Sequence, residues 1–204
     1  MARVYVIGLA GGIGSGKSAA AAAFEKLGAV VLDADAMVHE LLRKPAILRK
    51  IVRRFGKDVL DRRGRVDRKK LGEEVFRSQQ AIRDLEAMLH PEVMRQSKRR
   101  IAQRKRRKKP SVVIIDAPLL FEAGMHRLCD EVVFVQTPKA ERLKRLRKTR
   151  GWSRRTLEAR EKRQKPLNIK RRNADTVVRN AGSRRELNAQ IRTVWQRVRQ
   201  LLNG

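Results

Sequence analysis

Short, mostly apolar runs alternate along the chain with longer segments in which apolar residues recur every three or four positions. The short runs lie at 4–9, 29–32, 112–115, 132–135 and 176–178. A nearly continuous apolar run of this length is typical of a strand that is buried on both faces of a parallel sheet. Strands that alternate with helices therefore predict an α/β fold, in which helices cover a parallel sheet on both sides.

The segments between these runs carry the boundary signals of helices. The expected helices cover about 17–27, 35–43, 45–55, 138–148 and a C-terminal segment after Ser183. Gly28 provides a stop for the first helix, and Pro45 opens the third. Ser153 can cap a further helix after the break at Gly151. Ser183 and Glu186 form a capping box, which predicts where the last helix begins.

A long helical block occupies the middle of the chain. The pattern is helical almost throughout 67–109, and we expect an interruption at His90-Pro91. Pro91 would then be the first residue of a new helix, a position that proline favours. Because the block 45–109 lies between strand segments, it has the character of an insertion over the carboxyl edge of the sheet, where substrates of such folds bind.

The turn after the first strand fits the pattern G-x-x-x-x-G-K-[ST]. Its residues are Gly11, Gly12, Ile13, Gly14, Ser15, Gly16, Lys17 and Ser18, and Ala19 follows in the helix. Glycines let backbone N–H groups turn inward around a phosphate chain, and the start of a helix adds the positive end of its dipole. Lys17 is expected to reach the β- and γ-phosphates, and the Ser18 hydroxyl to help hold Mg²⁺. The motif predicts a nucleoside triphosphate site.

Acidic residues end two of the predicted strands. A carboxylate at Asp33 can face the γ-phosphate and accept a proton from an attacking hydroxyl. Capping of the next helix is the alternative for Asp33 and for Asp35; we assign the cap to Asp35 and the chemistry to Asp33. Asp116 follows the third strand, at a position where phosphate-loop enzymes often hold Mg²⁺, directly or through water. His39, one helical turn after Asp35, either contacts substrate or is simply packed or solvated.

Arginines crowd the segment after the fourth strand. Helical spacing puts Arg142 and Arg145 on one face, and Arg150 lies beside the break at Gly151. Phosphoryl-transfer enzymes commonly bring arginines down on a mobile lid, and the planar guanidinium suits phosphate. Most of the sixteen cations in 139–172 must still be plain surface, so we expect only one or two of them to act at the site.

The composition is strongly basic, with 51 Lys and Arg residues against 21 Asp and Glu residues and a formal net charge of +30. Such a surface attracts polyanions, nucleotides or nucleic acid, or it is only a compositional bias on solvated helix faces. The single cysteine, Cys129, excludes an internal disulfide and suits a reducing cytoplasm. No apolar run has the length of a membrane span, and the early first strand leaves no room for a signal peptide. We expect a cytoplasmic enzyme.

In combination, these motifs resemble the dephospho-coenzyme A kinase family over nearly the whole chain. The matching segments are 7–18, 33–35, 39–41, 64–68, 116–124 and 180–183, with single matches at Leu71, Val75, Phe76, Leu85, Glu86, His90, Pro91, Arg145, Leu146, Arg150, Arg160, Gln164, Lys170, Ala174 and Asp175. The resemblance implies ATP-dependent, Mg²⁺-assisted phosphorylation of the ribose 3′-hydroxyl of dephospho-CoA. It also implies a core at 1–44, 110–138 and 173–204, a helical substrate subdomain at 45–109 and a lid at 139–172.

The resemblance assigns roles to individual residues. It implies that Asp33 is the base, that Arg145 and Arg150 are lid arginines, and that Asn180 and Gly182 lie by the adenine of ATP. Asp35, His39, Leu119 and Glu122 are the candidates for binding the acceptor substrate, although Glu122 could instead pair with a neighbouring arginine.

The basic runs at 98–109 and 154–172 exceed what this family leads us to expect. Aromatic residues that could stack with bases are few, with Trp152 and Trp195 in separate elements. We therefore expect compositional bias, with at most weak, non-specific binding of nucleic acid, and we expect a monomer without a membrane partner. Two other functions stay open: a nucleoside or nucleotide kinase with another acceptor, and a nucleic-acid-binding ATPase.

Overall fold

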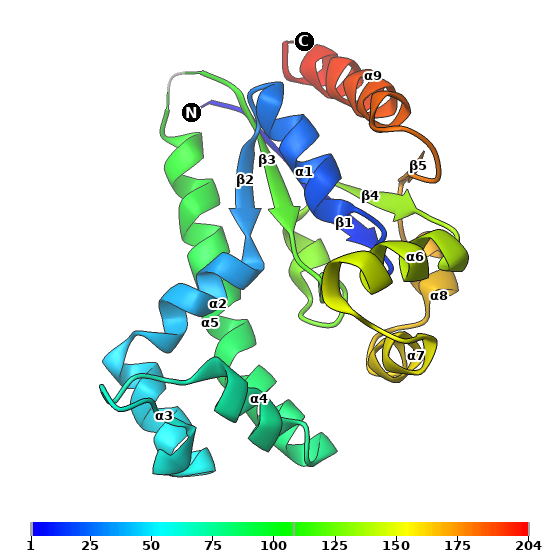
Figure 1. Cartoon of the computed structure of the whole chain (residues 1–204). Helices are drawn as coiled ribbons and strands as arrows, with labels where there is room; N and C mark the ends of the chain where they lie inside the picture. Colours follow the sequence, from blue (N-terminus) through cyan, green and yellow to red (C-terminus); the bar gives the residue numbers. More distant parts are fainter. Residues whose placement is uncertain (1, 108, 204) are drawn as a thin grey trace. The chain divides into compact units, whose positions relative to one another are not determined.

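The computed structural model describes residues 2–107 and 109–203 and contains a five-stranded parallel sheet (Figure 1). The strands are β1 (Val4–Gly11), β2 (Val30–Asp33), β3 (Ser111–Asp116), β4 (Glu131–Gln136) and β5 (Thr176–Arg179), in the order β2-β3-β1-β4-β5. The predicted α/β class and all five strands are confirmed. Lys108, which the predicted helix 67–109 and the basic run include, lies outside the described residues.

Helices connect these strands, as the alternating pattern predicts. The α-helices are α1 (Lys17–Lys26), α2 (Ala34–Leu42), α3 (Pro45–Phe55), α4 (Arg68–Val75), α5 (Gln79–Lys105), α6 (Lys139–Arg150), α7 (Arg154–Glu161), α8 (Leu167–Arg172) and α9 (Arg184–Asn203). Short 3₁₀ turns occur at η1 (Lys57–Val59) and η2 (Met125–Leu128). The Ser153 hydroxyl accepts from the Thr156 N–H, and the Ser183 hydroxyl accepts from the Glu186 N–H. Both predicted caps are therefore confirmed.

The chain divides into two compact units, Met1–Asp33 together with Arg100–Gly204, and Ala34–Arg99. The sheet, the phosphate loop and the segment expected to be the lid all belong to the first unit. The second unit is helical and buries Met37, Leu41, Ile51 and Leu71. The finer division into core, substrate subdomain and lid stays a prediction.

The core of the sheet unit lies between the strands and two helices, α1 and α9, which run side by side in Figure 1. The apolar face predicted for the last helix is buried there through Leu187, Ile191, Val194 and Val198. Phe24 of α1 is also completely buried. Because burying an aliphatic or aromatic side chain stabilises by about 1.5–3 kcal/mol, this face holds α9 and α1 against the strand that leads into the phosphate loop.

The predicted interruption at His90-Pro91 is wrong, because α5 continues through Pro91. Proline removes one backbone donor, but Leu89 and Val93 on either side of it are buried. Their packing keeps the helix in place across the missing hydrogen bond. The break lies instead between α4 and α5, where the Ser78 hydroxyl accepts from the Ala81 N–H at 3.0 Å.

The predicted cap at Asp35 is also wrong. Helix α2 begins at Ala34, directly after the last residue of β2, so no loop residue separates the strand from the helix. Asp35 lies inside the first turn of α2. The carboxylate of Asp35 is still stabilised by the positive end of the helix dipole. The residue that directly precedes α2, however, is Asp33.

A buried carboxylate joins three strands to the last helix. Glu131, only 3% exposed, accepts from Thr176 Oγ1 at 2.6 Å, from Arg197 Nη2 at 2.5 Å and from the Tyr5 hydroxyl at 3.3 Å. The hydrogen bond that Arg197 donates to Glu131 raises the pKa of Arg197. One side chain thus links β1, β4, β5 and α9.

Replacing Glu131 with Gln is expected to lower the free energy of unfolding by about 2 kcal/mol, because the amide cannot accept from all three donors. The loss stays moderate because the Arg197 side chain is 47% exposed and can be hydrated. Urea unfolding should show a lower midpoint with an unchanged slope. Glu25→Gln, on the exposed side of α1, should shift stability by less than about 0.5 kcal/mol; equal losses in the two variants would contradict the role of the network.

Candidate active site

The phosphate loop is the turn between the end of β1 at Gly11 and the start of α1 at Lys17. Gly14 and Gly16 have φ values of +77° and +92°, a left-handed conformation that favours glycine. Gly16 also has no space for a side chain, because a Cβ there would lie 2.2 Å from Asn180 Nδ2. The loop can take this shape only with glycine at these positions.

Unused backbone donors gather in this loop. Its internal hydrogen bond runs from the Ser15 N–H to the Gly12 carbonyl at 3.1 Å, whereas the N–H groups of Gly14 and Gly16 donate to no acceptor among the described residues. The first turn of α1 adds further N–H groups that have no acceptor within their helix. Such a cluster of donors at a helix start is a binding site for an anion such as phosphate.

Lys17 folds back onto the start of the same loop. Its Nζ donates to the carbonyls of Gly11 and Gly12, both at 3.2 Å. The ammonium group is therefore held at the loop that carries the unused N–H groups. A phosphate chain in the loop would meet both the donors and this charge.

The carbonyl of Ser15 receives three donors. Thr137 Oγ1 lies at 2.9 Å, Asn180 Nδ2 at 2.7 Å and Arg145 Nη1 at 3.5 Å from this oxygen, and Arg145 Nη2 also donates to the Asn180 carbonyl at 2.8 Å. The Ser15 side chain itself is fully buried. Asn180, predicted to lie by the adenine, and Arg145, predicted to be a lid arginine, thus contact the loop itself.

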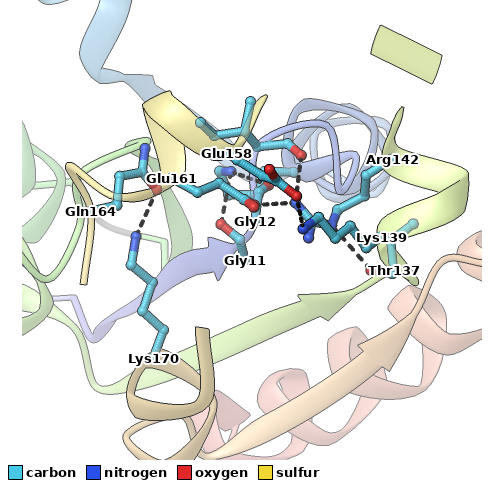
Figure 2. A network of polar contacts seen from close by, with 11 residues as sticks. Gly11, Gly12, Thr137, Lys139, Arg142, Glu158, Glu161, Gln164 and Lys170 are labelled. Carbon is cyan, nitrogen blue, oxygen red and sulfur yellow. Dashed lines mark hydrogen bonds and ion pairs between the residues drawn. The ribbon is translucent and has the colours of Figure 1, made fainter. Parts of the chain in front are cut away.

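Arg142 lies against the loop as well (Figure 2). It is only 3% exposed, it donates to the Thr137 carbonyl through Nε at 3.3 Å and to the Ile13 carbonyl through Nη1 at 3.1 Å, and it forms an ion pair with Glu161 of α7. A Cβ on Gly12 would lie 2.7 Å from its Nη1. Gly12 is therefore the residue that lets this guanidinium approach.

Asp33 and Asp116 are neighbours at the carboxyl edge of the sheet. They end β2 and β3 and are partners in the register of these strands, and Leu9 of β1 is paired with Asp116 on the other side. Adjacent strands lie about 4.8 Å apart, so the two carboxylates extend from neighbouring positions. The predicted base and the predicted metal ligand come from one place in the fold.

Ser18 and Asp116 provide oxygen atoms of the kind that Mg²⁺ prefers. Within residues 2–107 and 109–203, no three or more His, Cys, Asp or Glu side chains form a metal site by themselves. Mg²⁺ at nucleotide sites commonly takes one or two carboxylates and completes its shell with phosphate oxygens and water. The exposed Ser18 in the first turn of α1 and the carboxylate of Asp116 fit this arrangement.

Arg150 does not share the position of Arg145. Its guanidinium lies 5.1 Å from the centre of the Trp152 ring, and that of Arg160 lies 4.4 Å from the same centre. Burial lowers the pKa of Arg160, and the charges of Arg163 and Arg150 lower it further. Arg145 therefore lies against the loop, whereas Arg150 and Arg160 lie around Trp152.

Glu122 is tied to α8 and to the residues before it. Its Oε1 lies 2.8 Å from Nζ of Lys170 and accepts from the Lys165 N–H at 2.8 Å, and Lys170 also donates to Gln164 Oε1 at 3.0 Å. Lys170 is 2% exposed, so this pair is largely removed from water. Glu122 therefore has a basic partner, as one of the two alternatives for it expected, but this partner is a lysine and not an arginine.

The remaining candidates have separate surroundings. Leu119 is half-buried in the turn after β3, and a Cβ on Gly182 would lie 2.0 Å from Glu186 Oε2. Asp35 and His39 are exposed on α2 of the helical unit. Their assignment to substrate stays a prediction.

Sequence reasoning did not single out Thr137 or Glu161. It named Arg142 only as one of the arginines on a helix face, without its contacts to the loop, and it did not identify Lys170 as the partner of Glu122. For Arg142 a signal existed, because it lies four residues before Leu146 and both are buried on one face of α6. An arginine on an apolar stripe indicates a guanidinium with internal partners.

Comparison with known proteins identifies similar sequences. A family model described as dephospho-CoA kinase matches residues 5–186. The dephospho-CoA kinase of Corynebacterium diphtheriae is 39% identical over 193 residues, which cover 94% of this chain and 96% of that protein. That of Thermobifida fusca is 36% identical over 200 residues, which cover 97% and 98%.

Two solved structures are similar over nearly the whole chain. A Thermus thermophilus protein has a TM-score of 0.80 at 33% identity, covering 96% of this chain and 98% of that one. A dephospho-CoA kinase from Campylobacter jejuni has a TM-score of 0.70 at 26% identity, covering 96% and 97%. Among the helices in the described part of this chain, none is long and apolar enough to cross a bilayer.

Proposed function

The chain belongs to the dephospho-CoA kinase family, and from this premise we propose that it transfers the γ-phosphoryl group of ATP to the ribose 3′-hydroxyl of dephospho-CoA. The product is coenzyme A. The observation that carries the proposal is the phosphate loop, which combines N–H groups at Gly14 and Gly16 that donate to no described acceptor with the ammonium of Lys17, held at the loop carbonyls of Gly11 and Gly12. These donors match a triphosphate, and the family supplies the acceptor.

Asp33 is proposed as the base. Its carboxylate accepts the proton of the 3′-hydroxyl as that oxygen forms a bond to the γ-phosphorus. The bond from the γ-phosphorus to the bridging oxygen breaks, and ADP leaves with the electron pair. The position of Asp33 at the end of β2, in register with Asp116, supports this role, since the loop strand β1 lies next to β3.

Lys17 and the loop N–H groups bind and orient the phosphates and stabilise the charge of the transition state. Ser18 and Asp116 would hold Mg²⁺, which neutralises phosphate charge when bound. Arg145 supports the loop through the Ser15 carbonyl, and Arg150 is proposed to approach the nucleotide from the Trp152 cluster. Asn180 and Gly182 are assigned to the adenine side, and Asp35, His39, Leu119 and Glu122 to the acceptor.

A comparison of acceptors tests the proposal. With ATP and Mg²⁺, we expect turnover of dephospho-CoA at a kcat/KM at least about 10²-fold above that of any nucleoside or nucleoside monophosphate, because a site built to pair a substrate's polar groups rejects analogues that lack them. Coupled measurement of ADP release follows each acceptor. Transfer to a nucleoside at an equal rate, or no transfer to dephospho-CoA, would reject the assignment.

The basic surface needs a separate control. If the chain were a nucleic-acid-dependent ATPase, RNA or DNA would stimulate ATP hydrolysis without any acceptor. We expect no stimulation, and any binding should weaken steeply with salt.

A further inference from the structure

We propose that Arg142 acts through the phosphate loop: its guanidinium polarises the peptide unit between Ile13 and Gly14 and thereby strengthens the N–H of Gly14 as a donor to phosphate. The inference rests on the proposed function in that it takes the loop to bind a nucleotide. It makes Arg142 a positioning residue that never contacts the phosphates itself.

The geometry of the peptide unit is the basis of this inference. A trans peptide is planar, so its carbonyl and its N–H point in opposite directions. Arg142 Nη1 donates to the Ile13 carbonyl at 3.1 Å, and the N–H of the same unit belongs to Gly14, which donates to no described residue. A cation on one end of the unit and an anion on the other polarise it in the same direction.

The next peptide but one repeats the arrangement. The Ser15 carbonyl accepts hydrogen bonds from Thr137, Asn180 and Arg145. The N–H of the same peptide unit belongs to Gly16, and this N–H likewise donates to no described residue. Hydrogen bonds in series strengthen one another, by roughly 10–30% for each bond. In both peptide units, Ile13–Gly14 and Ser15–Gly16, the carbonyl accepts hydrogen bonds from the protein, whereas the N–H donates to no described residue.

Arg142 is held in this position by the fold. It is 3% exposed, it also donates to the Thr137 carbonyl, and it pairs with Glu161. The missing Cβ of Gly12 leaves the space that Nη1 occupies. Hydrogen bonds from charged donors are about twice as strong as those from neutral donors. The bond from Arg142 to the Ile13 carbonyl should therefore polarise this peptide unit strongly.

The test is a set of variants observed by ¹H–¹⁵N NMR and by calorimetric titration with ADP. Arg142→Gln removes the charge and most of the donors, and Arg147→Gln removes the same charge from an exposed position on the same helix. A cavity of about 520 Å³ borders Arg142 and Gly12, so water can reach the carbonyl in the glutamine variant. In Arg142→Gln the carboxylate of Glu161 loses its ion-pair partner, so the double variant with Glu161→Gln removes this unpaired charge as well.

In Arg142→Gln, with or without Glu161→Gln, we expect the Gly14 amide proton to move upfield, both in the free protein and with ADP, while the Gly16 resonance keeps its position. The Kd for ADP should rise about tenfold, in keeping with the loss of a charge-assisted bond, while the KM for dephospho-CoA stays unchanged. Arg147→Gln should change none of these values. Arg142→Lys, which keeps the charge without the fork, should fall between wild type and Arg142→Gln.

Weaker ADP binding with an unmoved Gly14 resonance would overturn the proposal, because Arg142 would then only support the fold. Equal effects of Arg142→Gln and Arg147→Gln would overturn it in favour of the general field of the basic surface. If Arg142→Gln does not fold, the Arg142→Lys comparison decides in the same way. Failure of the proposed function would be seen differently, as normal ADP binding without transfer to dephospho-CoA.

Discussion

Replacing Asp33 with asparagine is expected to lower kcat by at least about 10²-fold, the usual contribution of a general base, and to leave the affinity for ATP nearly unchanged. Asparagine has almost the same shape but cannot take the proton of the attacking hydroxyl. We propose that the loop N–H groups and Lys17 bind the phosphates, and the substitution leaves these residues in the protein. Steady-state kinetics with ATP and dephospho-CoA, together with ADP titration, separate the two effects.

The matched control is Glu25→Gln, which removes one negative charge from the same unit at an exposed position on α1. It should keep full turnover. Because Asp33 joins β2 directly to α2, the melting temperature of Asp33→Asn must also be compared with that of wild type. A folded variant with unchanged kcat would reduce Asp33 to a structural residue of this junction.

The features that local sequence decides were predictable. Strand β1, the glycine turn and the start of α1 follow from residues that are adjacent in the chain, and so do the caps at Ser153 and Ser183. The position of Asp33 and Asp116 at one edge of the sheet was predictable, because both end strands of a parallel sheet, whereas the pairing of β2 with β3 was not predicted. These parts of the site depend on short-range rules of backbone and capping.

Contacts between distant residues were not predictable in the same way. Arg142 is one of sixteen cations in 139–172, and its inward direction depends on Gly12 and Glu161, which lie far from it along the chain. Glu122 and Lys170 are separated by most of the lid segment. Pro91 shows the same limit, since packing of Leu89 and Val93 overrides the local tendency of proline to interrupt a helix.

Replacing Lys17 with alanine is expected to lower kcat/KM for ATP by about 10³-fold, at the upper end of what one oriented donor contributes in a transition state. Lys17 Nζ is held by the carbonyls of Gly11 and Gly12, so the charge is already positioned before the nucleotide arrives. Its loss should raise the KM for ATP, because the phosphates are already negatively charged in the ground state. It should also lower kcat, because the charge that shifts in the transition state loses a stabilising cation.

Lys26→Ala, an exposed lysine on the same helix, removes an equal charge and should leave both constants within about twofold, since exposed charges are screened by solvent. Lys17→Arg should recover little, because the planar fork cannot replace a point charge between two carbonyls. Normal ATP kinetics in Lys17→Ala would show that the loop N–H groups suffice alone. The contrast with Asp33→Asn then separates the two roles. A change in kcat alone is expected for the residue that takes the proton of the acceptor hydroxyl, whereas a joint change in kcat and in the KM for ATP is expected for a residue that binds the phosphates of the donor.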